Sequence, residues 1–109
     1  MKIDFNNIEE TVISNMRGGK GHIKAKMFFD GQNKIMRAVI SKGCSIGIHT
    51  HETSSEIIYA LSGKAVCYFE GEQQTLTSGN CHYCPKGSSH GIENFEDEDF
   101  VLFAVVPEQ

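Results

Sequence analysis

The chain of 109 residues contains no tryptophan, only two prolines and only two arginines, and no long uninterrupted apolar run. A transmembrane helix requires about 18 consecutive apolar residues, so a membrane is not expected as a partner. The formal net charge of −4 leaves no excess of basic residues. Nucleic acid is therefore not expected as a partner either, because phosphate binding requires a basic face.

Export features are also missing, because residues 1–7 contain no apolar segment followed by a small-residue cleavage site. The sequence thus predicts a cytoplasmic location, in which cysteines stay reduced. We expect Cys44, Cys67, Cys81 and Cys84 to be mostly buried thiols that pack as small apolar groups. Cys81 and Cys84 form a CxxC pair, but a four-sulfur zinc site needs a second pair and a redox CxxC usually opens a helix. We expect this pair to serve packing, with a cavity-lining position open for one of them.

The length suits a single domain over residues 1–109, because each half alone would be too small to bury a useful core. Residues 1–21 show the least pattern and are expected to form an irregular N-terminal arm. Within this arm, Asn7 and Glu10 have the spacing of a capping box ahead of a short helical turn at Thr11. Three glycines within residues 17–21 predict a loop.

From residue 22 onward almost every segment has the pattern of a β-strand. Ile23 and Ala25, for example, alternate with Lys24 and Lys26, which puts apolar and charged side chains on opposite faces. Glycine-containing turns separate most of the segments, and no amphipathic helix of three turns is present. Eight or so short strands of this kind predict an all-β sandwich or barrel. The expected strands cover residues 22–29, 34–41, 56–61, 64–70, 73–77, 81–84, 90–95 and 100–106.

Four residues are candidates for holding a metal ion. His49 and His51 are two positions apart, so on a strand their imidazoles point to the same face and can reach one ion. Glu56 begins an apolar run, where a charge is unusual unless something neutralises it. His90 lies far along the chain, so only the fold could bring it close. Taken singly, each residue also has an ordinary structural explanation, such as a surface histidine or a glutamate paired with a lysine.

Two longer patterns contain all four residues. Residues 43–63 have the form G-x5-HxH-x4-E-x6-G, and residues 79–94 have the form G-x5-PxG-x2-H-x3-N. Both match the two sequence motifs of the cupin superfamily at every fixed position. The chain strongly resembles small single-domain bacterial cupins, in particular the oxalate-decarboxylase-like group.

The resemblance implies a double-stranded β-helix, the cupin or jelly-roll barrel, with one divalent transition metal ion. By the same resemblance its ligands are His49, His51, Glu56 and His90. Three imidazoles and one carboxylate suit Mn, Fe, Ni, Zn, Cu or Co, whereas Mg and Ca prefer oxygen ligands. The resemblance also implies that Gly63 and Gly79 occupy turns, that Pro85 and Gly87 shape the loop presenting His90, and that Asn94 is structural.

The expected function is a metal-dependent enzyme that acts on a small oxygen-rich anion such as a dicarboxylate, keto acid or sugar acid. Decarboxylase, dioxygenase, isomerase and lyase reactions all occur on this architecture, and the fold does not choose among them. The alternatives are a non-catalytic module that binds or senses a small ligand, and a structural cupin with an empty site.

Few residues in the sequence are candidates for catalysis. Tyr59, Tyr68, Tyr83 and His82 could approach the cavity, and Arg37 could bind a substrate carboxylate. An exposed position is nevertheless the commoner one for an arginine. Small cupins commonly pair, so we also expect a homodimer that uses the apolar strands at residues 35–40 and 100–106.

Overall fold

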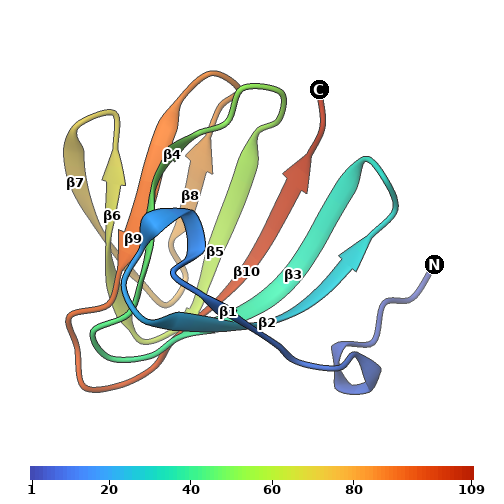
Figure 1. The fold of residues 1–109 in the computed structure, drawn as a ribbon, viewed down its shortest axis with the longest axis horizontal. Coiled ribbons are helices and arrows are strands. Elements are labelled where there is room, and N and C mark those ends of the chain that lie inside the picture. The colour runs from blue at the N-terminus through green and yellow to red at the C-terminus, as the bar shows by residue number, and fades with distance from the viewer.

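The computed structural model describes residues 1–109 and contains ten strands and two short 3-10 helices, η1 (Phe5–Asn7) and η2 (Met16–Gly18) (Figure 1). Neither helical segment has the length or apolar character needed to cross a membrane. The strands are β1 (Thr11–Ser14), β2 (His22–Phe29), β3 (Asn33–Ile40), β4 (Ser45–Thr50), β5 (Glu56–Ser62), β6 (Lys64–Phe69), β7 (Glu72–Thr77), β8 (Cys81–Cys84), β9 (Ser89–Glu93) and β10 (Phe100–Pro107).

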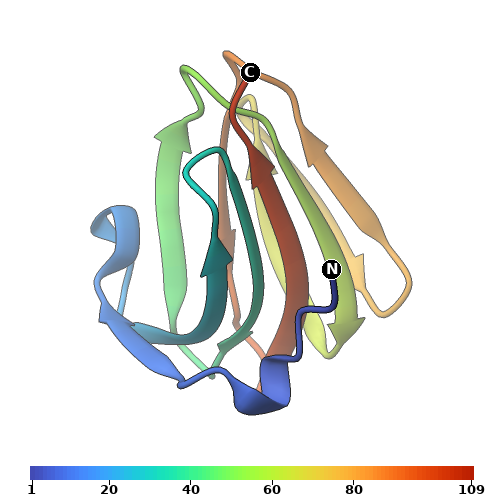
Figure 2. The same cartoon turned by 90° about the vertical axis from the view of Figure 1, so that its right-hand side faces the viewer.

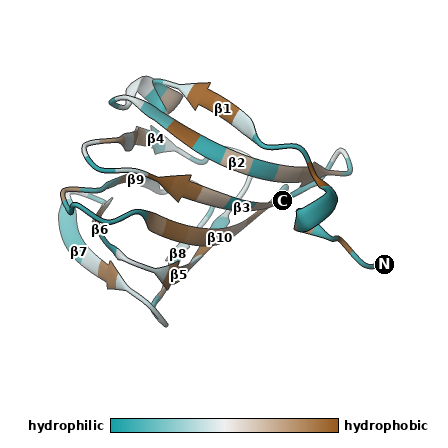
Figure 3. Ribbon diagram, turned by 90° about the horizontal axis from the view of Figure 1, so that it is seen from below, coloured by the Kyte–Doolittle hydropathy of each residue, from teal (hydrophilic) through white to brown (hydrophobic).

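The strands form two antiparallel sheets that face each other (Figure 2). The larger sheet has the order β1-β2-β3-β10-β5-β8, and the smaller has the order β4-β9-β6-β7. Seen from below, the two sheets curve around a common interior, and polar and apolar residues alternate along strands such as β2 (Figure 3). This architecture confirms the predicted all-β double-stranded β-helix.

The core lies between the sheets and follows from the two-residue period of the strands. In β5, Ile58 and Ala60 are buried, whereas Ile57 and Tyr59 on the opposite face are exposed. The same alternation on the other strands completes a core cluster of 16 buried residues, in which the largest fully buried side chain is Phe100. Glu56 has the same parity as Ile58, so the register that fills the core also turns this carboxylate inward.

The N-terminal arm is more regular than the sequence predicts. The helical turn expected at Thr11 is wrong, because Thr11–Ser14 pairs with Ala25–His22 as an edge strand of the larger sheet. Its branched side chains fit an extended strand better than a short helix, and the free edge of β2 supplies the backbone partners. Helical structure occurs earlier, at η1, where the Asp4 carboxylate accepts a hydrogen bond from the backbone N–H of Asn6 at 3.0 Å.

The loop around η2 packs directly on β4. A side chain at Gly19 would overlap the carbonyl of Ser45, and one at Gly47 would overlap the carbonyl of Arg17. Only glycine therefore allows the two backbones to approach this closely. Reciprocal hydrogen bonds between Lys20 and Ser45 fix the contact, with an N–O distance of 2.9 Å from the Ser45 N–H to the Lys20 carbonyl.

Asn94 joins three parts of the chain where β9 ends. Its fully buried amide donates to the carbonyls of Ile40 and Glu98, both at 2.8 Å, and its side-chain oxygen accepts from the N–H of Glu96 at 2.8 Å. These bonds hold the exposed loop before β10 against the end of β3. The contacts agree with the structural role that the motif implies for this residue.

Replacing Asn94 with alanine should therefore lower the free energy of unfolding by about 1–3 kcal/mol, because the Ile40 carbonyl loses its donor inside the protein. Urea unfolding followed by circular dichroism measures this change. Asn7→Ala is the matched control, since Asn7 is exposed and its loss should cost less than about 0.5 kcal/mol. Equal losses in the two variants would contradict the role assigned to Asn94.

Candidate metal centre

Four side chains from both sheets converge between them. His49 lies on β4 and stands opposite His90 of β9 in the strand pairing. His51 follows β4 directly, and its backbone is tied by hydrogen bonds to Gly87 and Ser88, in the loop that leads to His90. The larger sheet contributes the carboxylate, from the first residue of β5. The group is therefore His49, His51, Glu56 and His90, as the motifs imply, and it could hold a metal ion.

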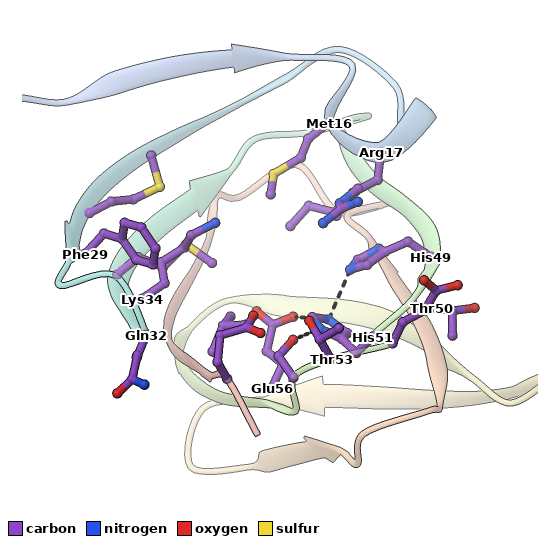
Figure 4. A pocket seen from close by; sticks show the side chains of 17 residues that line it. Met16, Arg17, Phe29, Gln32, Lys34, His49, Thr50, His51, Thr53 and Glu56 are labelled. Atoms are coloured by element: carbon purple, nitrogen blue, oxygen red, sulfur yellow. Dashed lines mark hydrogen bonds and ion pairs between the residues drawn. The ribbon is translucent and has the colours of Figure 1, made fainter.

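The ligand atoms of this group lie close together, and Figure 4 shows three of the side chains, His49, His51 and Glu56. The Nε2 atom of His51 is 3.2 Å from the Nε2 of His49 and 2.9 Å from the Nε2 of His90. The Oε1 atom of Glu56 is 3.1 Å from the Nε2 of His51 and 2.9 Å from that of His90. All four ligand atoms lie within 4.8 Å of one another.

These spacings fit a common metal ion. Two ligand atoms about 2.1 Å from one ion and at right angles to each other are about 3.0 Å apart, whereas a tetrahedral angle separates them by about 3.4 Å. The four measured distances, 2.9–3.2 Å, match the right-angle arrangement.

The orientation of each imidazole is fixed by a partner on its other nitrogen. The Nδ1 of His49 donates to the carbonyl of Gly47 at 2.8 Å, which leaves a lone pair on its Nε2. The Nδ1 of His51 lies 2.9 Å from the Ser54 hydroxyl, and that of His90 lies 3.0 Å from the Nε2 of His82. Such partners set the tautomer and ring orientation of metal-binding histidines.

The electrostatic environment favours the metal-binding protonation states of Glu56 and His49. Burial raises the pKa of Glu56, but the hydrogen bonds from His51 and His90 outweigh it and bring the pKa from 4.5 to about 2. Burial lowers the pKa of His49, and the positive charges that His90, His51 and Arg17 can carry lower it further, against the Gly47 hydrogen bond. Near neutral pH Glu56 is thus a carboxylate, and the lowered pKa of His49 favours its neutral imidazole, the form that binds a metal.

One side of the group opens into a cavity of about 600 Å³ (Figure 4), a size typical of small-molecule sites. His49, His51 and Glu56 form part of its wall, and two cationic side chains, Arg17 and Lys34, form another part. The remaining lining residues are Met16, Met27, Phe29, Gln32, Met36, Ile46, Thr50, Glu52, Thr53, Ser54, Val106 and Glu108.

The structure does not bring the expected catalytic candidates to this cavity. Tyr59, Tyr83 and Arg37 are exposed on the outer face of the larger sheet, because they alternate with the buried positions of β5, β8 and β3. Tyr68 lies on β6, where its hydroxyl donates to Glu93 at 3.3 Å. His82 is the only one of these candidates near the metal ligands, and it touches them through His90.

Several cavity residues are not evident from the sequence. Arg17 was assigned to a loop, yet it is the arginine that lines the cavity. Glu52 and Glu108 also line it and add two exposed carboxylates. Among Arg17, Glu52 and Glu108, only Glu52 has a sequence signal for a position at the cavity, because it directly follows His51. The sequence places Lys34 on a strand, but nothing in its pattern shows that the start of β3 forms a cavity wall.

The cysteines behave as expected of reduced thiols. All four are free, and Cys44, Cys67 and Cys84 are buried while Cys81 is exposed. Burial raises the pKa of Cys67 to about 12 and that of Cys84 to about 11, which suppresses the reactive thiolate. Cys81 and Cys84 point to opposite faces of β8, so they do not form a redox pair, and neither lines the cavity.

His82→Ala should lower the affinity of the protein for a divalent transition metal by roughly 10- to 100-fold, because the His90 ring loses the partner that orients it. His82 packs between the rings of Phe69 and His90, at centroid distances of 5.4 and 5.2 Å. Isothermal titration with Mn²⁺ or Co²⁺ measures the change at a temperature where circular dichroism shows a folded variant.

The control for this measurement is His22→Ala, a half-buried histidine of β2 that does not contact the cluster. Its metal affinity should equal that of the wild type. An unchanged affinity in His82→Ala would show that His90 needs no orienting partner.

Comparison with known proteins agrees with this geometry. Residues 36–106 match the family model of the cupin domain. The chain is 33% identical to an oxalate-binding protein of Thermotoga maritima, over 97% of this chain and 93% of that one. The crystal structure of a protein described as a predicted oxalate decarboxylase, also from Thermotoga maritima, superposes with a TM-score of 0.93 at 30% identity, with both chains fully covered. A sugar phosphate isomerase of Silicibacter pomeroyi shares the fold, with a TM-score of 0.81 at 17% identity over all of this chain and 74% of that one. The chain therefore belongs to the cupin family.

Proposed function

We propose that this cupin holds one divalent transition metal ion through His49, His51, Glu56 and His90 and acts there on a small oxygen-rich anion. The observation that carries the proposal is the convergence of the four ligand atoms beside a cavity of about 600 Å³, whose wall includes His49, His51 and Glu56. The relative named as oxalate-binding, which is similar over nearly the whole chain, supports an anion as the ligand.

The charges of the site favour an anion. Glu56 supplies one negative charge to the ligand set, so a bound dication leaves the centre net positive. When bound, the metal would supply Lewis-acid character and coordination positions for ligand oxygens. On the cavity wall the positive charges of Arg17 and Lys34 are balanced by Glu52 and Glu108, so the net positive charge lies at the metal centre. Dicarboxylates, keto acids and sugar acids carry the neighbouring oxygens and negative charge that such a site selects.

A catalytic role, rather than binding alone, is favoured by the acidic residues of the cavity wall. Glu52 and Glu108 lie on the same cavity as the metal ligands. Proton transfer during turnover requires a titratable group within reach of the bound molecule, and these carboxylates are candidates for it. A binding or sensing module would not need them, so a turnover assay separates the two functions.

His51→Ala should abolish tight metal binding, because His51 is the ligand whose Nε2 lies within 3.2 Å of the other three ligand atoms. Isothermal titration of the metal-free protein with Mn²⁺, Co²⁺, Ni²⁺ and Zn²⁺ measures this change in metal affinity.

Titration of the loaded wild type with oxalate and 2-oxo acids should then show binding that His51→Ala lacks. Consumption of any of these anions by the loaded protein, lost in His51→Ala, identifies an enzyme. Full metal affinity in His51→Ala would refute the assigned site.

We further propose that the protein is cytoplasmic, a compartment in which its four free cysteines would stay reduced, and that it forms a homodimer. The outer face of the larger sheet supports a dimer, since Val105, Ile57 and Tyr83 form a row across β10, β5 and β8. Ile57 and Tyr83 are 39% and 55% exposed, which leaves apolar surface for a second copy to cover.

Light scattering should give a mass of about twice 12.1 kDa for the wild type at micromolar concentration. Ile57→Asp should yield a monomer, because a charge at the centre of the apolar row opposes burial. Ile48→Asp is the matched control, since Ile48 is an exposed isoleucine of the smaller sheet, and it should remain dimeric. A wild-type monomer would contradict the proposed assembly.

A further inference from the structure

The two arginines of the chain are both exposed but lie on different sides of the molecule. Arg37 lies on the exposed face of β3, away from the cavity, whereas Arg17 lines the cavity beside His49. The guanidinium of Arg17 forms no hydrogen bond or ion pair within the protein, although Glu52 and Glu108 line the same cavity. In Figure 4 its side chain extends from the loop above His49 into the cavity. A cation held there without a protein partner is available to a ligand.

The loop that carries Arg17 is built to hold this position. Arg17 has φ +54° and ψ +33°, a left-handed conformation that few residues other than glycine adopt. Hydrogen bonds across the loop maintain it, from the N–H of Gly18 to the carbonyl of Asn15 at 3.0 Å and from the Asn15 side-chain amide to the carbonyl of Gly19 at 3.1 Å. Such backbone conformations persist only where the surroundings enforce them, and they concentrate at functional sites.

The same loop is anchored to the strand that presents a metal ligand. The Arg17 carbonyl packs against Gly47, and the carbonyl of Gly47 orients the ring of His49. The backbone of Arg17 and the imidazole of His49 are thus positioned by one residue of β4. Lys34 lines the cavity from the start of β3 and adds a second cation.

We propose that Arg17 determines the ligand preference of the site. Its guanidinium binds those carboxylate oxygens of a small dicarboxylate that do not coordinate the metal ion. The planar guanidinium can donate two parallel hydrogen bonds to a carboxylate, which an ammonium group cannot reproduce. The inference rests on the proposed function, because the metal centre must first hold the other oxygens of the same molecule.

The experiment compares the wild type with Arg17→Gly, Arg17→Lys and Arg37→Gln, all loaded with Mn²⁺ and titrated with oxalate. Arg17→Gly should weaken oxalate binding by roughly 10- to 100-fold, the range expected for loss of charge-assisted hydrogen bonds. Arg17→Lys should recover part of the loss. Arg37→Gln removes the same charge from the outer face and should leave the affinity unchanged.

Two further readouts separate ligand binding from a structural role of the loop. Glycine adopts the left-handed conformation without strain, so the melting temperature of Arg17→Gly should not fall below that of the wild type. Its Mn²⁺ affinity should stay equal or increase, because a positive charge near the cation has been removed. Acetohydroxamate, a metal chelator without a carboxylate, should bind wild type and Arg17→Gly within about threefold of each other.

Equal oxalate affinity in the wild type and Arg17→Gly would overturn the inference while leaving the proposed function intact. A joint fall in melting temperature, Mn²⁺ affinity and oxalate affinity would also overturn it, by showing that Arg17 only maintains the loop. If the loaded wild type binds neither oxalate nor acetohydroxamate, the proposed function itself fails, and the role of Arg17 fails with it.

Discussion

The carboxylate of Glu56 is buried between the two sheets, and the arrangement of the site depends on how that charge is compensated. An isolated carboxylate in a protein interior costs several kcal/mol unless it is paired and hydrogen-bonded. Glu56 is only 6% exposed, and its partners within the protein are the Nε2 atoms of His51 and His90. Because Glu56 belongs to the larger sheet and the histidines lie at β4 and β9, this contact also joins the two sheets at the site.

The three histidines cannot by themselves supply a proton for every short contact in the cluster. The Nε2 of His51 lies within hydrogen-bond distance of three atoms, yet one neutral imidazole nitrogen carries at most one proton. The Nε2 of His49 has a lone pair, since its Nδ1 donates to Gly47. A single proton on the Nε2 of His51 can serve only one of these neighbours, whereas a cation among the four side chains would accept a lone pair from each of them. The number of available protons and the spacing of the ligand atoms therefore both support the metal site proposed above.

Much of this was predictable from the sequence, because alternation and turn glycines mark most of the strands. Segments 22–29 and 81–84 coincide with β2 and β8. The sequence does not predict β1, because residues 1–21 show no clear alternation and the spacing of Asn7 and Glu10 indicates a helical turn there instead. The inward position of Glu56 also determines where Tyr59 points. Residues 57 and 59 must point away from the core if 56 and 58 point into it, so Tyr59 could have been excluded from the cavity by parity alone.

The position of Arg17 was not predictable in the same way, since it depends on contacts distant in sequence. Arg37 lies on a regular strand and seemed the better candidate, whereas Arg17 lies among glycines that indicate only a loop. The direction of that loop is set by the close packing of Gly19 and Gly47, residues that are 28 positions apart. Such a contact has no local pattern, because glycine marks the absence of a side chain and not the identity of its neighbour.

The distribution of polarity within the cavity constrains the molecule that it holds. The metal ligands and Arg17 form one part of the wall, whereas Met16, Met27, Phe29 and Val106 give other parts an apolar character. A volume of about 600 Å³ also exceeds what a two-carbon dicarboxylate fills. An anion bound at the metal centre would therefore leave apolar surface uncovered, which favours ligands that carry a carbon chain or ring beyond their chelating oxygens. On this reasoning oxalate is a suitable probe of the polar end of the site, and longer keto acids and dicarboxylates are the better match to the whole cavity.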